Sequence, residues 1–327
     1  MSLYSAHLDV PGSLVLHDAL PYILQWKYLA IAVFLASLAA VHFRGKVRHA
    51  FFRKQLVDHS ALFAPYNVLA YWLSKVPTTP FIPREQFPEL APLRENWQVM
   101  RDEAMALFEQ GRVTPGGPRT EEDAGFTTFF KRGWTRFHLK WYRKPLPSAV
   151  ALCPKTVEIL NRIPSVRAAT FAMMKPGGNL NPHRDPYAGV LRYHLGLSTP
   201  NDDRCRISVD GQLYSWRDGE DVIFDETYVH WVKNETDAYR MILFCDIIRP
   251  ARFRLMYHLN NFMGTAVGRS MAVRNVEGEP LGWINHVYFL LHYVEEGRRR
   301  LKHFSKPLYR IAKAALAVAV ILLLIRL

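Results

Sequence analysis

The hydrophobic pattern divides the chain into apolar ends and a middle of short alternating runs. Near the N-terminus, residues 22–43 are nearly uncharged, with aromatic residues at both edges, and approach the roughly 20 residues that a membrane-spanning helix needs. A secretory signal peptide and a buried core helix are the alternatives. The signal peptide is disfavoured because the basic cluster follows the apolar segment instead of preceding it. We therefore predict a transmembrane helix over residues 22–43, after a lead at residues 1–21.

Apolar residues also mark the C-terminus, where residues 311–327 carry basic residues at both edges. Because long basic side chains can reach the headgroups from an apolar segment, we predict a second transmembrane helix there, with an amphipathic anchor as the alternative. Residues 61–73 are apolar but short and interrupted by Pro65. They predict either a helix in the membrane interface or a helix that covers one face of the central domain.

A different pattern, with apolar residues at every second position, begins at Ala168. Asp210 and Gly211 separate two such runs and form the strongest short hairpin signal. Strands are predicted at residues 134–142, 168–174, 190–197, 205–209, 212–216, 222–224 and 240–247. Short strands divided by turn residues predict a small antiparallel barrel or jelly roll. Covering helices are predicted at residues 93–108 and 153–163, after a Pro-rich strap at residues 76–92.

The net charge narrows the choice of partners. Lys and Arg number 42 against 29 Asp and Glu, a balance of +13 at pH 7, which suits nucleic acid, an anionic membrane or an anionic substrate. No recognisable nucleic-acid module occurs, so nucleic acid is not an expected partner. The basic residues gather beside the apolar ends, at residues 44–54 and 298–313, which favours an anionic membrane surface. By the positive-inside rule, both clusters place the central domain in the cytoplasm.

The cysteines argue against a covalent or zinc-bound framework. Cys153, Cys205 and Cys245 are odd in number and scattered, without paired spacing. We expect three small buried side chains in a reducing compartment.

Candidate metal ligands lie within the alternating region. His183 and Asp185 are two residues apart on an extended segment, so their side chains point the same way. His230 comes from a later strand. Two histidines and one carboxylate on one face of a metal are the ligand set of non-haem iron oxygenases. A polar surface loop, flanked by Pro182 and Pro186, is the alternative interpretation.

Cationic side chains accompany these ligands. Arg192 and His194 lie on one face of the strand that follows the His-x-Asp motif, and Arg240 begins a later strand. A guanidinium holds a carboxylate through two parallel hydrogen bonds, so Arg240 is the predicted anchor of a dicarboxylate cosubstrate. An ordinary strand-edge arginine is the alternative.

The run from His183 to Leu197, followed by residues 224–230 and by Tyr239-Arg240, resembles the aspartyl/asparaginyl β-hydroxylase family. The resemblance covers about residues 134–250, and its motifs are specific as a set. It implies a mainly β core with the double-stranded β-helix (jelly-roll) fold. Within that family, residues 42–48, the strap at residues 75–77 and the two apolar ends are similar to the bacterial lipid A 2-hydroxylases.

This resemblance also implies the chemistry. Members of the family use Fe(II), with 2-oxoglutarate and O2 as cosubstrates. The implied iron ligands are His183, Asp185 and His230. Arg240 would bind the distal carboxylate of 2-oxoglutarate, with Arg192 and His194 near its C1 carboxylate. The animal peptide hydroxylases of the family carry glycine where Asp185 stands and a carboxylate-binding serine where Ala172 stands.

The predicted function is hydroxylation of C2 of a fatty acyl chain of lipid A at the cytoplasmic face of the bacterial inner membrane. Lipid A or another anionic glycolipid and the bilayer are the expected partners, and no protein partner is predicted. A peptide aspartyl/asparaginyl β-hydroxylase and a non-catalytic, membrane-anchored cupin-like binding protein are the alternatives. We therefore divide the chain between its two ends into four segments. These are a transmembrane helix at 22–43, a basic juxtamembrane segment and strap at 44–92, the dioxygenase domain at 93–260 and a C-terminal extension with a basic flank at 261–310.

Overall fold

The computed structural model describes residues 26–48, 55, 58–112, 114–115, 134–142 and 144–326. The predicted lead at residues 1–21 and the first residues of the predicted transmembrane helix, 22–25, lie outside the described residues.

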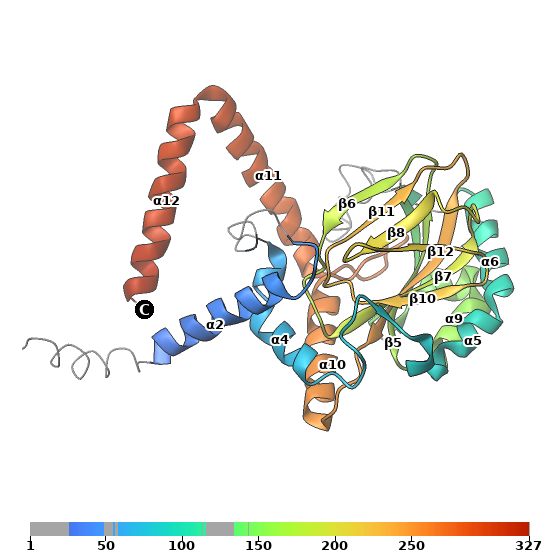
Figure 1. Ribbon diagram of the computed structural model, residues 1–327. Helices are drawn as coiled ribbons and strands as arrows, with labels where there is room; N and C mark the ends of the chain where they lie inside the picture. The colour runs from blue at the N-terminus through green and yellow to red at the C-terminus, as the bar shows by residue number, and fades with distance from the viewer. Residues whose placement is uncertain are drawn as a thin grey trace, which may run out of the picture.

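Two antiparallel sheets packed face to face form the centre of the protein (Figure 1). The larger sheet has the order β1-β10-β7-β12-β5-β3-β2, with β4 paired to β3, and the smaller has the order β6-β11-β8-β9. The strands of the larger sheet are β1 Phe81–Ile82, β2 Thr114–Pro115, β3 Trp134–Trp141, β4 Lys144–Pro145, β5 Val166–Met174, β7 Val190–Ser198, β10 Asp221–Phe224 and β12 Arg240–Ile248. Those of the smaller sheet are β6 Asn179–His183, β8 Cys205–Val209, β9 Gln212–Ser215 and β11 His230–Asn234.

From β5 to β12 the chain passes back and forth between the two sheets, which is the connectivity of a jelly roll. The predicted jelly roll is therefore confirmed. The predicted hairpin is present as well, because Asp210 and Gly211 join β8 to β9 with φ angles of 52° and 84°. Positive φ at both central residues is the geometry that matches the twist of a two-residue hairpin. All three cysteines are free and buried, as expected.

Separate hydrophobic cores lie on the two faces of the larger sheet. The inner core, between the sheets, joins Met174 and Ile242 to Leu180 and Val232. The outer core lies under short helices that cover the other face of the larger sheet (Figure 1). These elements are the 3-10 helices η2 Arg84–Gln86 and η3 Pro88–Leu90 and the helices α5 Ala91–Glu95, α6 Trp97–Glu109, α8 Pro147–Leu152 and α9 Pro154–Asn161. The covering helices predicted from the spacing of apolar residues are therefore present.

A second group of helices lies on the other side of the domain (Figure 1). It consists of α2 Trp26–Phe43, the 3-10 helix η1 His59–Ala61, α4 Ala64–Trp72 and α10 Arg254–Ser270. Helix α10 was not predicted from the sequence, and it continues past residue 260, where the domain boundary was expected. Its Gly268 is needed for close packing, since a Cβ atom there would lie 2.0 Å from the ring of Tyr142.

Among the described residues, α2 is the one helix that is long and apolar enough to cross a membrane. The chain ends in α11 Trp283–Phe304 and α12 Lys306–Arg326. The C-terminal apolar segment is thus helical, and its insertion into a membrane stays a prediction.

Candidate metal and anion site

The structure brings the three predicted metal ligands together. Strand β6 ends at His183 and β11 begins at His230, and the antiparallel register places these two residues opposite each other. Asp185 follows β6 directly, and its Oδ1 lies 3.6 Å from Nε2 of His183. One ligand atom from each residue lies within 4.8 Å of the others. This cluster, the metal-ligand triad, has the spacing that a single ion requires.

Backbone carbonyl groups orient both imidazole rings. Nδ1 of His183 lies 2.8 Å from the carbonyl oxygen of Asn181, and Nδ1 of His230 lies 3.0 Å from that of Tyr228. A carbonyl oxygen can only accept, so each Nδ1 carries the proton and donates it. Each Nε2 then offers a lone pair, which is the tautomer of a metal-binding histidine.

The charge states also suit a cation. Burial, followed by the neighbouring His183, lowers the pKa of His230 to about 3, so its ring is neutral at pH 7. Burial opposes ionisation of Asp185, but its neighbours, above all the charge of Arg192, outweigh burial and lower the pKa of Asp185 below the usual range. A carboxylate with two imidazoles is a donor set for Fe(II).

Arg192 lies beside the triad and contacts three acidic side chains. Its guanidinium is 2.9 Å from Asp185 and 2.6 Å from Asp246, and it also contacts Glu226. Burial raises the pKa of Glu226 well above its usual range, and this side chain also hydrogen-bonds to Asp185. Arg192 therefore fixes the orientation of a candidate metal ligand. Its predicted contact with the C1 carboxylate of 2-oxoglutarate stays a prediction.

Arg240 is a fully buried cation without a hydrogen-bond partner in the described part of the chain. Its guanidinium carbon lies 4.6 Å from the ring centre of Trp134 and 4.5 Å from that of Trp216. Burial lowers the pKa of Arg240 to about 10, which leaves it charged at pH 7. Because an uncompensated buried charge is strongly destabilising, this arrangement points to an anion that binds there.

His194, the next predicted cosubstrate residue, is also buried near Arg240. Neither ring nitrogen has a hydrogen-bond partner among the described residues, and burial lowers its pKa well below the usual range. The ring lies 5.9 Å from that of Trp216, which also contacts Arg240. Two of the three predicted cosubstrate residues, His194 and Arg240, thus share one buried neighbour. Ala172 lies in the inner core beside Ile242, where its methyl group offers no hydrogen bond to a carboxylate.

Both segments that carry the triad are tied to the end of α2. Arg184, between two metal ligands, is buried and donates to the carbonyl oxygen of Val41 at 2.9 Å. Arg44, just after α2, lies 2.5 Å from Asp225 in the loop that leads to His230. Sequence reasoning missed these contacts, as it missed Glu226.

Asp225 is itself shared between two arginines. Besides Arg44, it contacts the buried Arg249, with 2.8 Å between Oδ2 and the guanidinium. Arg44 also donates to Thr227 at 2.7 Å and lies between the rings of Tyr71 and Tyr228. The sequence contains one signal for this network: Asp225 and Glu226 lie between two strands, a few residues before the candidate ligand His230.

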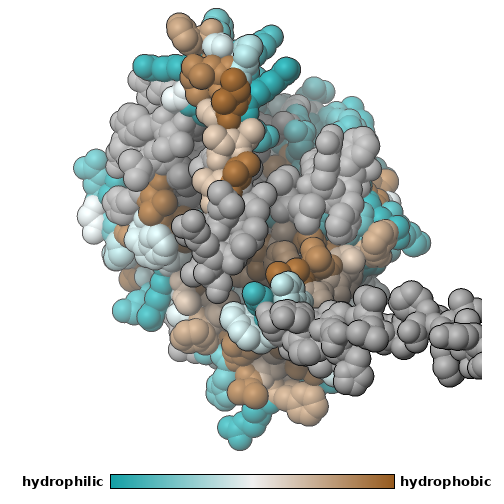
Figure 2. Space-filling view, turned by 90° about the vertical axis from the view of Figure 1, so that its left-hand side faces the viewer, coloured by the Kyte–Doolittle hydropathy of each residue, from teal (hydrophilic) through white to brown (hydrophobic). Residues whose placement is uncertain are grey.

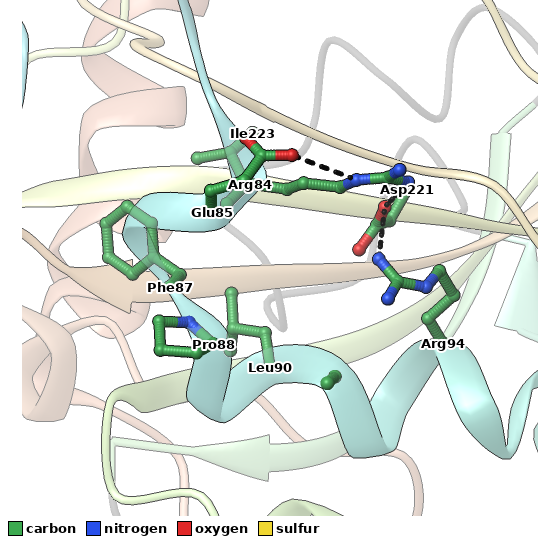
Figure 3. A pocket seen from close by; sticks show the side chains of 9 residues that line it. Arg84, Glu85, Phe87, Pro88, Leu90, Arg94, Asp221 and Ile223 are labelled. Carbon is green, nitrogen blue, oxygen red and sulfur yellow. Dashed lines mark ion pairs between the residues drawn. The ribbon is translucent and has the colours of Figure 1, made fainter.

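A separate cavity of about 370 Å³ lies on the outer side of β10 (Figure 3). There the carboxylate of Asp221 lies between Arg84 and Arg94, 3.7 and 3.6 Å from their guanidinium nitrogens. Ile223 beside it belongs to the outer core, so the sheet separates this cavity from the triad. Since Asp221 already balances part of the positive charge, we assign this cavity no ligand.

Comparison with known proteins relates the chain to one family of hydroxylases. Residues 94–250 match the family described as Aspartyl/Asparaginyl beta-hydroxylase. The ornithine lipid ester-linked acyl 2-hydroxylase of Rhizobium tropici is 31% identical over 180 residues, which are 55% of this chain and 64% of that protein. The aspartyl/asparaginyl beta-hydroxylase of Homo sapiens is 28% identical over 163 residues, which are 48% of this chain and 21% of that protein. The chain therefore spans less than two thirds of these relatives.

Solved structures share low sequence identity with the chain. A Pseudomonas putida prolyl-4-hydroxylase is 17% identical, with a TM-score of 0.33 over 47% of this chain and 87% of that one. The non-heme alpha ketoglutarate dependent carbocyclase SnoK from nogalamycin biosynthesis is 15% identical, with a TM-score of 0.32 over 59% of this chain and 88% of that one. The jelly roll itself rests on the strand order described above. The predicted resemblance to the hydroxylase family is confirmed by the match over residues 94–250.

Proposed function

We propose, from the match of residues 94–250 to the aspartyl/asparaginyl β-hydroxylase family, that the protein is an Fe(II)- and 2-oxoglutarate-dependent hydroxylase of a membrane lipid. It inserts a hydroxyl group at C2 of a fatty acyl chain, and lipid A at the cytoplasmic face of the inner membrane is the proposed substrate. One observation carries the choice of a lipid: Arg184, between two metal ligands, bonds to the end of the apolar helix α2.

The residues present fit the cofactor and the cosubstrate. His183, Asp185 and His230 would hold Fe(II), because they offer two imidazoles and one carboxylate within reach of one ion. Arg240, a buried guanidinium without a partner among the described residues, would hold the distal carboxylate of 2-oxoglutarate. Fe(II), 2-oxoglutarate and O2 would together supply the oxidation. One atom of O2 would be inserted into a C–H bond of the substrate, and the other would enter succinate as CO2 leaves.

The chain's own residues prepare this site. Arg192 and Glu226 both hold the carboxylate of Asp185, so the ligand needs little reorganisation when a cation binds. Burial of His230, Arg240 and His194 keeps bulk water from the interior, which strengthens their interactions with bound anions.

Two relatives favour different substrates. The Rhizobium tropici relative is named as an ornithine lipid acyl 2-hydroxylase, so ornithine lipid is a second candidate. The human relative is named as an aspartyl/asparaginyl beta-hydroxylase, which corresponds to the alternative of a peptide substrate. The link between the triad and α2 favours a lipid, because it places the reacting centre at the end of an apolar helix.

A reconstituted reaction separates these substrates. The full chain is placed in vesicles with Fe(II), O2 and 2-oxoglutarate, and receives lipid A, ornithine lipid or a peptide containing Asp and Asn. We expect one molecule of succinate for each lipid molecule that gains an oxygen atom. Mass spectrometry with fragmentation should place that oxygen at C2 of an acyl chain. Hydroxylated peptide with unchanged lipids would contradict the proposal, and no succinate with any substrate would support a binding protein instead.

A further inference from the structure

The outward face of α4 is apolar although the helix lies on the surface of the domain. Residues 61–73 contain no charged residue. The hydrogen-bonding groups of Tyr66 and Asn67 turn inward, to Tyr187 and Asn260 and to the backbone of residues 186 and 188. The outward side chains are the large apolar ones: Leu62 is 77% exposed and Trp72 is 75% exposed. A surface helix facing water would show the opposite arrangement.

Helix α10 also exposes large apolar side chains, here beside the exposed His258 and Arg269. Its buried face consists of Met256, Asn260, Gly264 and Gly268, four residues apart. On the opposite face Leu255 is 81% exposed and Phe262 is 68% exposed. These large side chains lie outside the apolar cluster that packs α10 on the domain, where Gly268 allows close approach to Tyr142.

The two faces join each other and the base of α2. Ala61 and Ala64 pack against Leu38 and Val41 of α2, while Ala70 of α4 packs with Met256 of α10. Figure 1 shows α4 and α10 side by side where α2 meets the domain. Figure 2 looks onto this side and shows hydrophobic side chains over the region of these helices, with hydrophilic ones at the margin. The apolar surface is therefore continuous with the candidate membrane span.

Basic side chains border this surface. A cavity of about 440 Å³ between the end of α4 and the start of α10 is lined by Lys75, Arg252, Arg254 and His258, against one acidic residue, Glu89. Lys46 and Arg48 are exposed just after α2. Basic groups beside exposed apolar residues match the headgroup layer of an anionic leaflet.

We propose that α4 and α10 together form a membrane-lying platform, which sinks into the headgroup layer of the anionic leaflet from which α2 emerges. Its outward residues are Leu62, Leu69, Trp72, Phe253, Leu255 and Phe262. The platform also sets the height of the metal-ligand triad. Asn67 of α4 donates to the carbonyl oxygen of Pro186 at 2.8 Å, one residue after Asp185.

Site-specific fluorescence in vesicles tests the platform. Leu255→Cys and Phe262→Cys are labelled with an environment-sensitive dye in the full chain, in vesicles of phosphatidylethanolamine and phosphatidylglycerol. The native cysteines are buried, so the dye reacts at the new thiol. Asp102→Cys is the matched control, because its side chain is 67% exposed on α6, on the other side of the domain.

Spin-labelled lipid is expected to quench the dye at positions 255 and 262 but not at position 102. Iodide in the water phase is expected to quench the two platform dyes about threefold less than the control, because the platform is embedded in lipid. Equal iodide quenching at all three positions would overturn the proposal. So would protection from both quenchers, which would mean that a protein surface covers the platform. No iron or 2-oxoglutarate is added, so the outcome does not depend on hydroxylation.

Discussion

Replacement of Arg240 by methionine is expected to raise the KM for 2-oxoglutarate by about 100-fold or more. Two charge-assisted hydrogen bonds to a carboxylate, each contributing roughly 1.5–3 kcal/mol, would be lost with the guanidinium. Because Arg240 has no other hydrogen-bond partner in the described residues, the change leaves no protein group without its bond. Succinate formation at varied 2-oxoglutarate measures the effect.

Thermal unfolding gives a second readout for the same substitution. Added 2-oxoglutarate is expected to raise the Tm of the wild-type protein and to leave that of Arg240→Met unchanged, since ligands stabilise only the state that binds them. Arg204→Met is the control, because Arg204 is exposed and pairs with Asp202 on the surface. An unchanged KM in Arg240→Met would show that the carboxylate binds elsewhere.

Replacement of Asp225 by asparagine is expected to destabilise the fold by roughly 3–5 kcal/mol, because it leaves two guanidinium groups without their carboxylate. Asp225 is fully buried and contacts Arg249 at 2.8 Å and Arg44 at 2.5 Å. Urea unfolding of the two proteins in the same detergent measures the difference. Asp203→Asn is the control: that side chain is 85% exposed, and its pair with Arg217 is open to solvent. Equal unfolding midpoints for wild type and Asp225→Asn would contradict the account.

The same pair of arginines gives the stabilisation a defined pH dependence. Burial opposes ionisation of Asp225, but Arg249 and then Arg44 outweigh it, so the pKa of Asp225 is lowered. A lowered pKa means that the carboxylate stabilises the fold above the pKa of an unfolded aspartate, about 3.9. The stabilisation is lost as the pH falls from there through the folded-state pKa. The difference between wild type and Asp225→Asn should therefore shrink on acidification.

Local patterns in the sequence were enough to predict the jelly roll and the triad. Alternation with period two marks the strands, and the spacing of His183 and Asp185 on an extended segment aligns their side chains. The turn at Asp210 and Gly211 has its own chemical signature. The strand, hairpin and His-x-Asp signals each lie within a few residues, whereas His230 is distant in sequence and was included with the help of the family resemblance.

Other features depend on contacts between distant residues. Arg44 and Asp225 are 181 positions apart, and no local pattern pairs them. Helix α10 went unpredicted although Leu255, Leu259 and Phe262 follow the helical period, so a local signal for this helix was present and was missed. The partners of Arg192 were missed for a related reason: Asp246 lies on another strand and Glu226 in a loop.

The central claim is that the triad holds the iron with which the protein hydroxylates a lipid acyl chain. The most direct measurement is the mass spectrum of membrane lipids, including lipid A, from bacterial cells that produce either the wild-type protein or His183→Ala at equal level. The account predicts a lipid species with one added oxygen atom at C2 of an acyl chain in the wild-type cells and none in the His183→Ala cells. The same hydroxylated lipid in both, or in neither, would contradict it.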